Sequence, residues 1–152
     1  MVFDHFSIAM KLAILFSGVY LWLGMLTGVW KYWQIRRSIQ ARAHYYVDIA
    51  HRSSLLYASA TLILAVFAEF SIWSETWNLI FVMINLVFFS ASILSYALHG
   101  YLKDTTNQFK VPHQLGNKVL PRTMMTLAMV LLVVGELFAT GMLVIGTGLN
   151  LF

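Results

Sequence analysis

The chain is organised as four long apolar stretches separated by short polar segments. The first extends over about residues 7–33, the second over about 43–72, the third over about 77–99 and the fourth over about 121–149. A membrane-spanning helix needs roughly 20 mostly apolar residues, and each stretch supplies them. The alternating pattern of a transmembrane β-barrel is absent. The sequence therefore predicts an all-α fold, a four-helix transmembrane bundle that forms a single integral membrane domain over residues 1–152.

Positive charge gathers in two of the three connecting regions. The region around the first connection carries Lys31, Arg36, Arg37, Arg42 and Arg52, and the third carries Lys103, Lys110, Lys118 and Arg122. The second connection contains Glu69 and Glu75 and no Lys or Arg. Because cytoplasmic loops of membrane proteins are enriched in Lys and Arg, both termini are predicted on the non-cytoplasmic side. Lys11, near the N-terminus, is the one basic residue that does not fit this orientation. The first apolar stretch is longer than that of a signal peptide, so a membrane span is expected there instead.

Composition narrows the classes of function. Hydrophobic residues make up 60% of the chain and charged residues 11%, about half the share that is usual in a soluble domain. The basic residues lie between apolar stretches, so membrane topology explains them better than binding to nucleic acid. The lipid bilayer is therefore an expected partner and nucleic acid is not. The chain has no cysteine, which excludes disulfides, thiolate metal sites and cysteine nucleophiles.

The densest group of ionisable residues lies at residues 41–52, at the entry to the second stretch. If a helix begins near Ala41, then His44, Asp48 and His51 fall at positions i, i+4 and i+7. That spacing would place all three side chains on one face of the helix. Such a stripe, entering the membrane from its cytoplasmic side, is a candidate site for chemistry.

Four of the five histidines are expected to meet at this membrane face. His44 and His51 come from the second stretch, His99 from the third, and His113 from the polar segment that follows, whereas His5 lies on the opposite side. Neutral imidazole is the commonest metal ligand in proteins and also binds haem iron. The alternative is that these histidines are interfacial residues, hydrogen-bonded to lipid head groups or to the backbone.

Two acidic residues have structural as well as functional interpretations. Asp48 can form a salt bridge with Arg52, four residues on, or can orient a histidine. Glu136 lies in the middle of the fourth stretch, where an ionisable residue is a functional candidate by default. A hydrogen bond between Glu136 and Asn85 of the third stretch is nevertheless expected ahead of a role in proton transfer.

Two short motifs resemble a known family. The sequence Ala-Arg-Ala-His at residues 41–44, at the entry to the second of four spans, resembles the haem-ligand motif of the styrene oxide isomerase family. The sequence Asn-Gln-Phe at residues 107–109 is similar to an Asn-Gln-Phe motif of the same family. Chain length, the number of spans, the distribution of charge and the lack of cysteine also agree. The resemblance can thus extend over most of the chain.

The resemblance implies both an architecture and an activity. The expected protein is a trimeric helical bundle in the bacterial cytoplasmic (inner) membrane, and it holds ferric haem b through one histidine. The expected reaction isomerises a small apolar aryl epoxide to an aldehyde with no net redox change. Ferric iron with an open coordination position acts as a Lewis acid on the epoxide oxygen, and a hydride then shifts to the neighbouring carbon.

The resemblance also assigns roles by position. His44 would be the axial ligand of the haem iron, with Arg42 and Asp48 in the cofactor-binding site, and Tyr96 would orient the substrate. The family has an asparagine six residues after the ligand, where this chain has Ala50. His51, the next residue, is therefore expected to replace that polar group in the catalytic site.

Three other classes of function remain open from the residues alone. A b-type cytochrome for electron transfer would use two histidine ligands, with His44 or His51 paired with His99 across two helices. A non-haem metal site would use His44, Asp48 and His51. A small scaffold or accessory protein would hold no cofactor.

Overall fold

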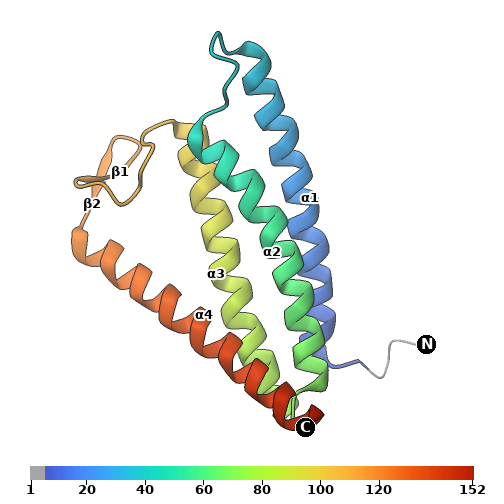
Figure 1. Ribbon diagram of the computed structural model, residues 1–152. Helices are drawn as coiled ribbons and strands as arrows, with labels where there is room; N and C mark the ends of the chain where they lie inside the picture. Colours follow the sequence, from blue (N-terminus) through green and yellow to red (C-terminus); the bar gives the residue numbers. More distant parts are fainter. Residues whose placement is uncertain (1–5) are drawn as a thin grey trace.

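The computed structural model describes residues 6–152 and consists mainly of four long helices (Figure 1). They are α1 (Ile8–Arg37), α2 (Tyr45–Phe70), α3 (Glu75–Leu102) and α4 (Arg122–Leu151). Each helix is long and apolar enough to cross a membrane, which confirms the predicted all-α, four-helix transmembrane architecture. The predicted spans agree with the helices to within four residues at every end.

The start of α2 differs from the expectation. A helix beginning near Ala41 was required to place His44, Asp48 and His51 on one stripe, but Ala41 has a φ of 52° and the helix begins at Tyr45. His44 is the N-cap residue, with extended backbone angles, and its side chain accepts a hydrogen bond from the Tyr46 N–H. The predicted common stripe is therefore wrong. His44 is directed by the geometry of the cap and not by the helical repeat.

A short β-hairpin lies between α3 and α4, in a segment that the sequence pattern describes only as a polar loop. Strands β1 (His113–Leu115) and β2 (Lys118–Leu120) pair in antiparallel register, with His113 opposite Leu120. The turn between them contains Gly116, whose φ of 59° is a conformation that glycine adopts without strain. The hairpin gives the third connection a defined shape at one end of the bundle.

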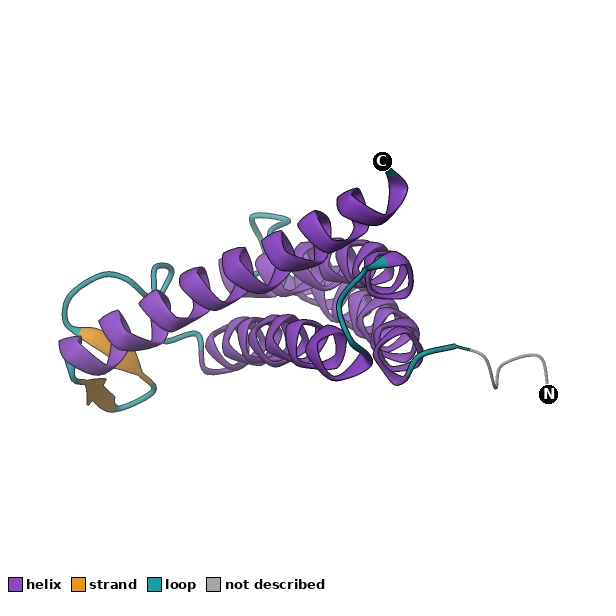
Figure 2. Cartoon of the chain, turned by 90° about the horizontal axis from the view of Figure 1, so that it is seen from below, coloured by secondary structure: helices purple, strands orange, loops and turns teal. Residues whose placement is uncertain are grey.

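Helices α1, α2 and α3 run side by side, whereas α4 crosses them at an angle (Figures 1 and 2). Among residues 6–152, every hydrogen bond that ties α4 to another part of the chain involves Thr140 or a residue after it. Thr147 donates to the Phe67 carbonyl over 2.9 Å, and Trp73 donates its ring N–H to the Met142 carbonyl over 2.7 Å. The C-terminal end of α4 is thus held against the bundle, and its N-terminal half diverges toward the hairpin.

The core combines small residues with polar groups that are satisfied by the backbone. Tyr20 of α1 is 1% exposed, and its hydroxyl donates to the Leu86 carbonyl of α3 over 2.9 Å. A Cβ atom at Gly24 would lie only 2.5 Å from Leu55, and one at Gly28 only 2.9 Å from the His51 ring. These two glycines therefore let α1 and α2 approach closely, as small residues commonly do between membrane helices.

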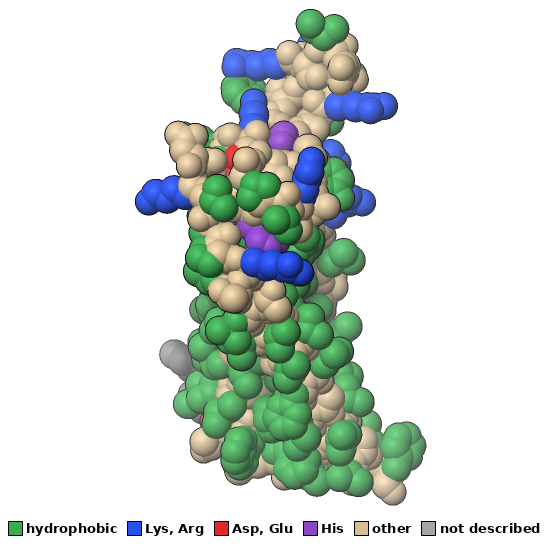
Figure 3. Space-filling view, turned by 90° about the vertical axis from the view of Figure 1, so that its left-hand side faces the viewer, with side chains coloured by type: hydrophobic (Ala, Val, Ile, Leu, Met, Phe, Trp, Pro, Cys, Tyr) green, Lys and Arg blue, Asp and Glu red, His purple; other side chains and the backbone are tan. Residues whose placement is uncertain are grey.

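Charge separates the two ends of the molecule. Lys and Arg side chains gather at the end that holds the α1–α2 connection and the hairpin, and the apolar surface extends away from it (Figure 3). At the other end, Glu75 accepts a hydrogen bond from the Ile8 backbone N–H, and Glu69 accepts from Ser7. Basic residues thus lie at one end of the bundle and acidic residues at the other, and the predicted orientation was based on this separation of charge. The orientation itself stays a prediction.

The absence of native cysteine makes the orientation directly measurable. Ile39→Cys, in the exposed α1–α2 connection, should react with a membrane-impermeant maleimide only from the cytoplasmic side. Ser74→Cys, exposed in the α2–α3 connection, should react only from the opposite side. Labelling of intact cells and of inverted vesicles distinguishes the two. The reverse pattern would overturn the predicted orientation.

Candidate haem-binding site

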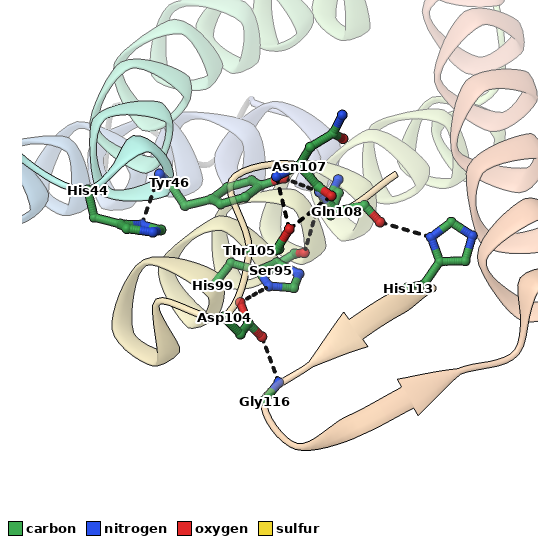
Figure 4. A network of polar contacts seen from close by, with 10 residues as sticks. All are labelled: His44, Tyr46, Ser95, His99, Asp104, Thr105, Asn107, Gln108, His113 and Gly116. Atoms are coloured by element: carbon green, nitrogen blue, oxygen red, sulfur yellow. Dashed lines mark hydrogen bonds and ion pairs between the residues drawn. The ribbon is translucent and has the colours of Figure 1, made fainter. Parts of the chain in front are cut away.

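The candidate site lies at the end of the bundle where α2 begins and α3 ends (Figure 4). We call His44, Tyr46, His99, Gln108 and His113 the polar cluster. They come from the cap of α2, the first turn of α2, the last turns of α3, the α3–β1 loop and strand β1. Three of the four histidines expected at this face are therefore brought together. His5, predicted on the opposite side, lies outside the described residues.

His44 is held by two hydrogen bonds. Its backbone N–H donates to the Gln34 side chain of α1 over 2.8 Å, and its Nδ1 accepts from the Tyr46 backbone N–H over 3.4 Å. Partial burial lowers the pKa of His44 below its ordinary value, and the nearby positive charge of Lys103 lowers it further. The ring is therefore neutral at pH 7, and neutral imidazole is the form that binds metals.

Tyr46 is the centre of the polar cluster and is only 3% exposed. Its ring centroid lies 6.4 Å from that of His44, 5.1 Å from that of His99 and 6.0 Å from that of Tyr96. Its hydroxyl accepts a hydrogen bond from the Gln108 backbone N–H. The sequence pattern indicates Tyr46 only as a residue of the membrane interface. The sequence carries no signal for its central place, because the cap at His44 is known only from the structure.

The α3–β1 loop and the hairpin are fixed to the bundle by a second set of contacts. Gln108 accepts at its side-chain oxygen from Ser95 over 3.2 Å, and its carbonyl lies 3.0 Å from His113 Nδ1. Asp104 bridges the hairpin and α3, since one carboxylate oxygen lies 2.8 Å from His99 Nδ1 and the other accepts from the Gly116 N–H over 2.6 Å. These contacts hold the loop and hairpin against α2 and α3.

The ionisation of Asp104 follows from these contacts. Burial by itself disfavours a charged carboxylate, but the Gly116 N–H and the His99 ring together lower the pKa of Asp104 below its ordinary value. The side chain is 5% exposed, so its charge is screened little by solvent. Asp104 is therefore ionised throughout the neutral range and can hold the hairpin in place.

Two open cavities meet at His44. One has a volume of about 570 Å³ and is lined by the apolar ring of Trp33 and by the cations Arg37, Arg42 and Lys103, with His44 at its wall. The other, of about 430 Å³, lies between His44 and the loop around Asp104. Both volumes fall in the range that is usual for cofactor and ligand pockets. Arg42 and His44 line the same cavity, and the role expected for Arg42 in a cofactor site stays a prediction.

His51 and Asp48 lie apart from the polar cluster. His51 faces α1, where its Nδ1 is 2.7 Å from the Gly24 carbonyl. Asp48 forms ion pairs with Lys31 of α1 over 2.6 Å and with Arg52 over 2.9 Å. The predicted i, i+4 salt bridge is confirmed. The roles expected for His51 in the catalytic site and for Asp48 in the cofactor site stay predictions.

The non-haem metal site expected from His44, Asp48 and His51 is not assembled. Among residues 6–152, no group of three or more His, Asp or Glu side chains is placed so that it could hold one metal ion. His44 caps α2, whereas the other two side chains are engaged by α1 and Arg52. The histidine that lines the two cavities is His44.

Tyr96 lines a third cavity between α3 and α4, which extends from Gln108 of the polar cluster into the membrane-spanning region and has a volume of about 420 Å³. The expected bond between Glu136 and Asn85 is not formed. Asn85 accepts instead from Thr140 over 2.9 Å and donates to the Phe81 carbonyl. Glu136 Oε1 is buried without a hydrogen-bond partner. Thr140 lies one turn after Glu136 on α4, and it takes the position that the carboxyl was expected to fill.

The attachment of the hairpin gives a testable prediction. Asp104→Asn removes the charge while keeping the shape, and it should lower the free energy of unfolding by about 1–3 kcal/mol. It should also speed tryptic cleavage at Lys110 and Lys118 in the folded protein. Asp48→Asn, which alters an ion-paired carboxylate on another helix, is the matched control and should leave that cleavage unchanged.

The same contacts predict the effect of acid on the hairpin. Because the pKa of Asp104 is lowered on folding, its contribution to stability is complete above the unfolded value of about 3.8 and is lost as the pH falls through the folded value. The hairpin of the native protein should therefore stay attached down to about pH 4. Release of the hairpin at pH 5 to 6 would contradict this assignment.

Known proteins give no further guide to these residues. The chain matches no protein-family model, no curated protein and no solved structure. The roles of the polar cluster are therefore argued from its own contacts and from the two sequence motifs.

Proposed function

We propose that the chain is a membrane-bound, haem-dependent isomerase that converts a small aryl epoxide to an aldehyde. One observation carries the proposal. The Gln108 N–H donates to the Tyr46 hydroxyl, and this bond joins the Asn-Gln-Phe motif at residues 107–109 to the segment that follows the Ala-Arg-Ala-His motif at residues 41–44. The two motifs that carry the family resemblance are more than 60 residues apart in sequence and adjacent in space.

The residues at His44 fit a haem held by one histidine. Among the described residues, no hydrogen bond engages His44 Nε2, so this nitrogen is available to iron. Nδ1 accepts from Tyr46 at 3.4 Å, which is longer than an ordinary N–H···O or N–H···N bond. A neutral imidazole that binds iron through Nε2 carries its proton on Nδ1, so ligand binding would replace only this weak capping contact.

The surroundings of His44 fit the rest of such a cofactor. Trp33 provides an apolar surface for a macrocycle, and Arg37, Arg42 and Lys103 supply positive charge for carboxylates at its edge. The chemistry that bound ferric haem would supply is Lewis-acid polarisation of the epoxide oxygen. Isomerisation moves a hydride within the substrate, so the reaction needs no external oxidant, reductant or proton.

The chain's own residues would then bind and orient the substrate and exclude water. Tyr96 lines the cavity between α3 and α4 and stacks on Tyr46, so its phenol lies between the polar cluster and the apolar interior. Tyr46 in turn stacks on both Tyr96 and His44. Apolar walls keep water away from an electron-poor carbon centre, which water would otherwise attack.

The remaining parts of the proposal concern assembly and location. A homotrimer in the bacterial inner membrane, with both termini on the non-cytoplasmic side, follows from the family resemblance and from the gathering of Lys and Arg at one end (Figure 3). His51 stays a candidate for the polar group that the family supplies as asparagine.

Haem binding separates the proposal from the two-ligand cytochrome. His44→Ala should abolish the Soret band of the purified protein, because it removes the ligand. His99→Ala should keep the band, because His99 is engaged by Asp104 and is not required as a ligand. Absorption spectra with haem quantified per chain provide the measurement. Loss of haem from folded His99→Ala, with the band retained in His44→Ala, would contradict the proposal.

Turnover of styrene oxide tests the role of Tyr96. Tyr96→Phe should lower kcat/KM for formation of phenylacetaldehyde by about tenfold or more while the haem content stays at the native level. Tyr101→Phe is the matched control, since Tyr101 is 76% exposed, and it should leave turnover unchanged. If haem-loaded native protein forms no aldehyde, then the isomerase assignment is wrong even though the haem assignment stands.

A further inference from the structure

The cavity between α3 and α4 has the walls of a site for an apolar molecule. It has a volume of about 420 Å³, and its apolar lining consists mainly of Phe88, Ala91, Met125, Ala128, Met129 and Leu132. Neither Lys, Arg, His, Asp nor Glu lines it. Ala91 of α3 and Ala128 of α4 are exposed, so the cavity opens sideways between these helices. At this depth the opening faces the hydrocarbon of the bilayer and not water.

One edge of the cavity is polar. Tyr57 of α2 stacks on Phe89 with ring centroids 4.3 Å apart, and Tyr57 and Ser92 both line the cavity. Each of these two hydroxyls can donate one hydrogen bond. Tyr96 also lines the cavity, and no hydrogen bond engages its hydroxyl among residues 6–152.

A second unsatisfied group lies on α4. Glu136 Oε1 is buried without a partner, one turn along α4 from the lining residue Leu132. A polar group that lacks a partner in an apolar medium is unfavourable. The cavity therefore combines apolar walls with hydrogen-bonding capacity that the protein itself does not use.

We propose that this cavity binds a small, uncharged aryl compound with one oxygen acceptor, which enters from the bilayer between α3 and α4. Tyr57, positioned by its stacking on Phe89, is a donor to that oxygen, together with Tyr96. The size is suitable, because a cavity of about 150 Å³ already accommodates benzene. The identity of the occupant as substrate or product rests on the proposed function, whereas the site and its polar edge do not.

The contribution of the oxygen can be measured with two probes of similar shape. The titration uses ¹⁹F NMR of the full chain in detergent micelles, with 4-fluoroacetophenone as the oxygen-bearing probe and 1-ethyl-4-fluorobenzene as the hydrocarbon. The ketone should bind saturably and more tightly than the hydrocarbon. Tyr57→Phe should weaken binding of the ketone by about three- to tenfold and leave binding of the hydrocarbon unchanged. Equal effects on both probes would show that Tyr57 acts only by packing and would overturn its assignment.

A pair of substitutions on adjacent positions of α4 tests the location. Ala128→Trp places a large side chain in the cavity and should weaken binding of both probes by about tenfold or more. Leu127→Trp, at a 60% exposed position that does not line the cavity, should leave binding unchanged. Ala128→Leu is the smaller version should the tryptophan variant fail to fold. Saturable binding that survives both cavity-filling substitutions, or probes that only partition into the micelle, would overturn the proposal.

The His44→Ala variant separates this inference from the proposed function. The α3–α4 cavity contains no haem ligand, so the variant should bind both probes with native affinity after it has lost haem. That result supports the cavity site whatever the fate of the isomerase assignment. If folded His44→Ala loses saturable binding, then the probes bind at the His44 site and the cavity between α3 and α4 is not the binding site.

Discussion

The hydrogen bond from the Gln108 N–H to the Tyr46 hydroxyl connects the membrane-spanning bundle to the only long segment outside the helices among the described residues. Both partners are buried, so breaking it would leave a backbone N–H without a partner where water is scarce. Together with the contacts of Ser95 and Asp104 it positions the α3–β1 loop, and it holds Tyr46 against both His44 and Tyr96. A single phenol thus sets the spatial relation between the open cavities at the membrane face and the cavity inside the span.

His44 both caps a helix and lines two cavities. As the N-cap of α2, it satisfies a backbone N–H that the first turn of a helix leaves free. As a neutral ring at the wall of two cavities, it also presents a nitrogen to whatever enters them. A ligand that takes Nε2 alters the protonation of Nδ1, so occupancy of the cavity acts directly on the first turn of α2.

The sequence predicts the four spans well and the site only in part, for physical reasons. Hydropathy along the chain indicates which segments are stable in lipid, and this was enough to predict the four helices α1 to α4. It does not report the backbone angle of Ala41, which delays α2 and turns His44 into a cap. Nor does it report the direction of a side chain around the helix, which sends His51 toward α1 and lets Thr140 take the place expected for Glu136. The hairpin was missed because its strands have three residues each and follow no apolar pattern.

Helix α4 is hydrogen-bonded to the bundle only through its C-terminal part among the residues that the structure describes. Its N-terminal half packs on α3 near Gly135 and otherwise exposes apolar side chains such as Leu127, Val130 and Leu131. In a bilayer these side chains lie against lipid acyl chains, so the thickness and chain order of the lipids act on this part of α4. The lipid composition of the membrane is therefore expected to influence the width of the cavity that α4 bounds, much as ionic strength influences the field of a charged surface.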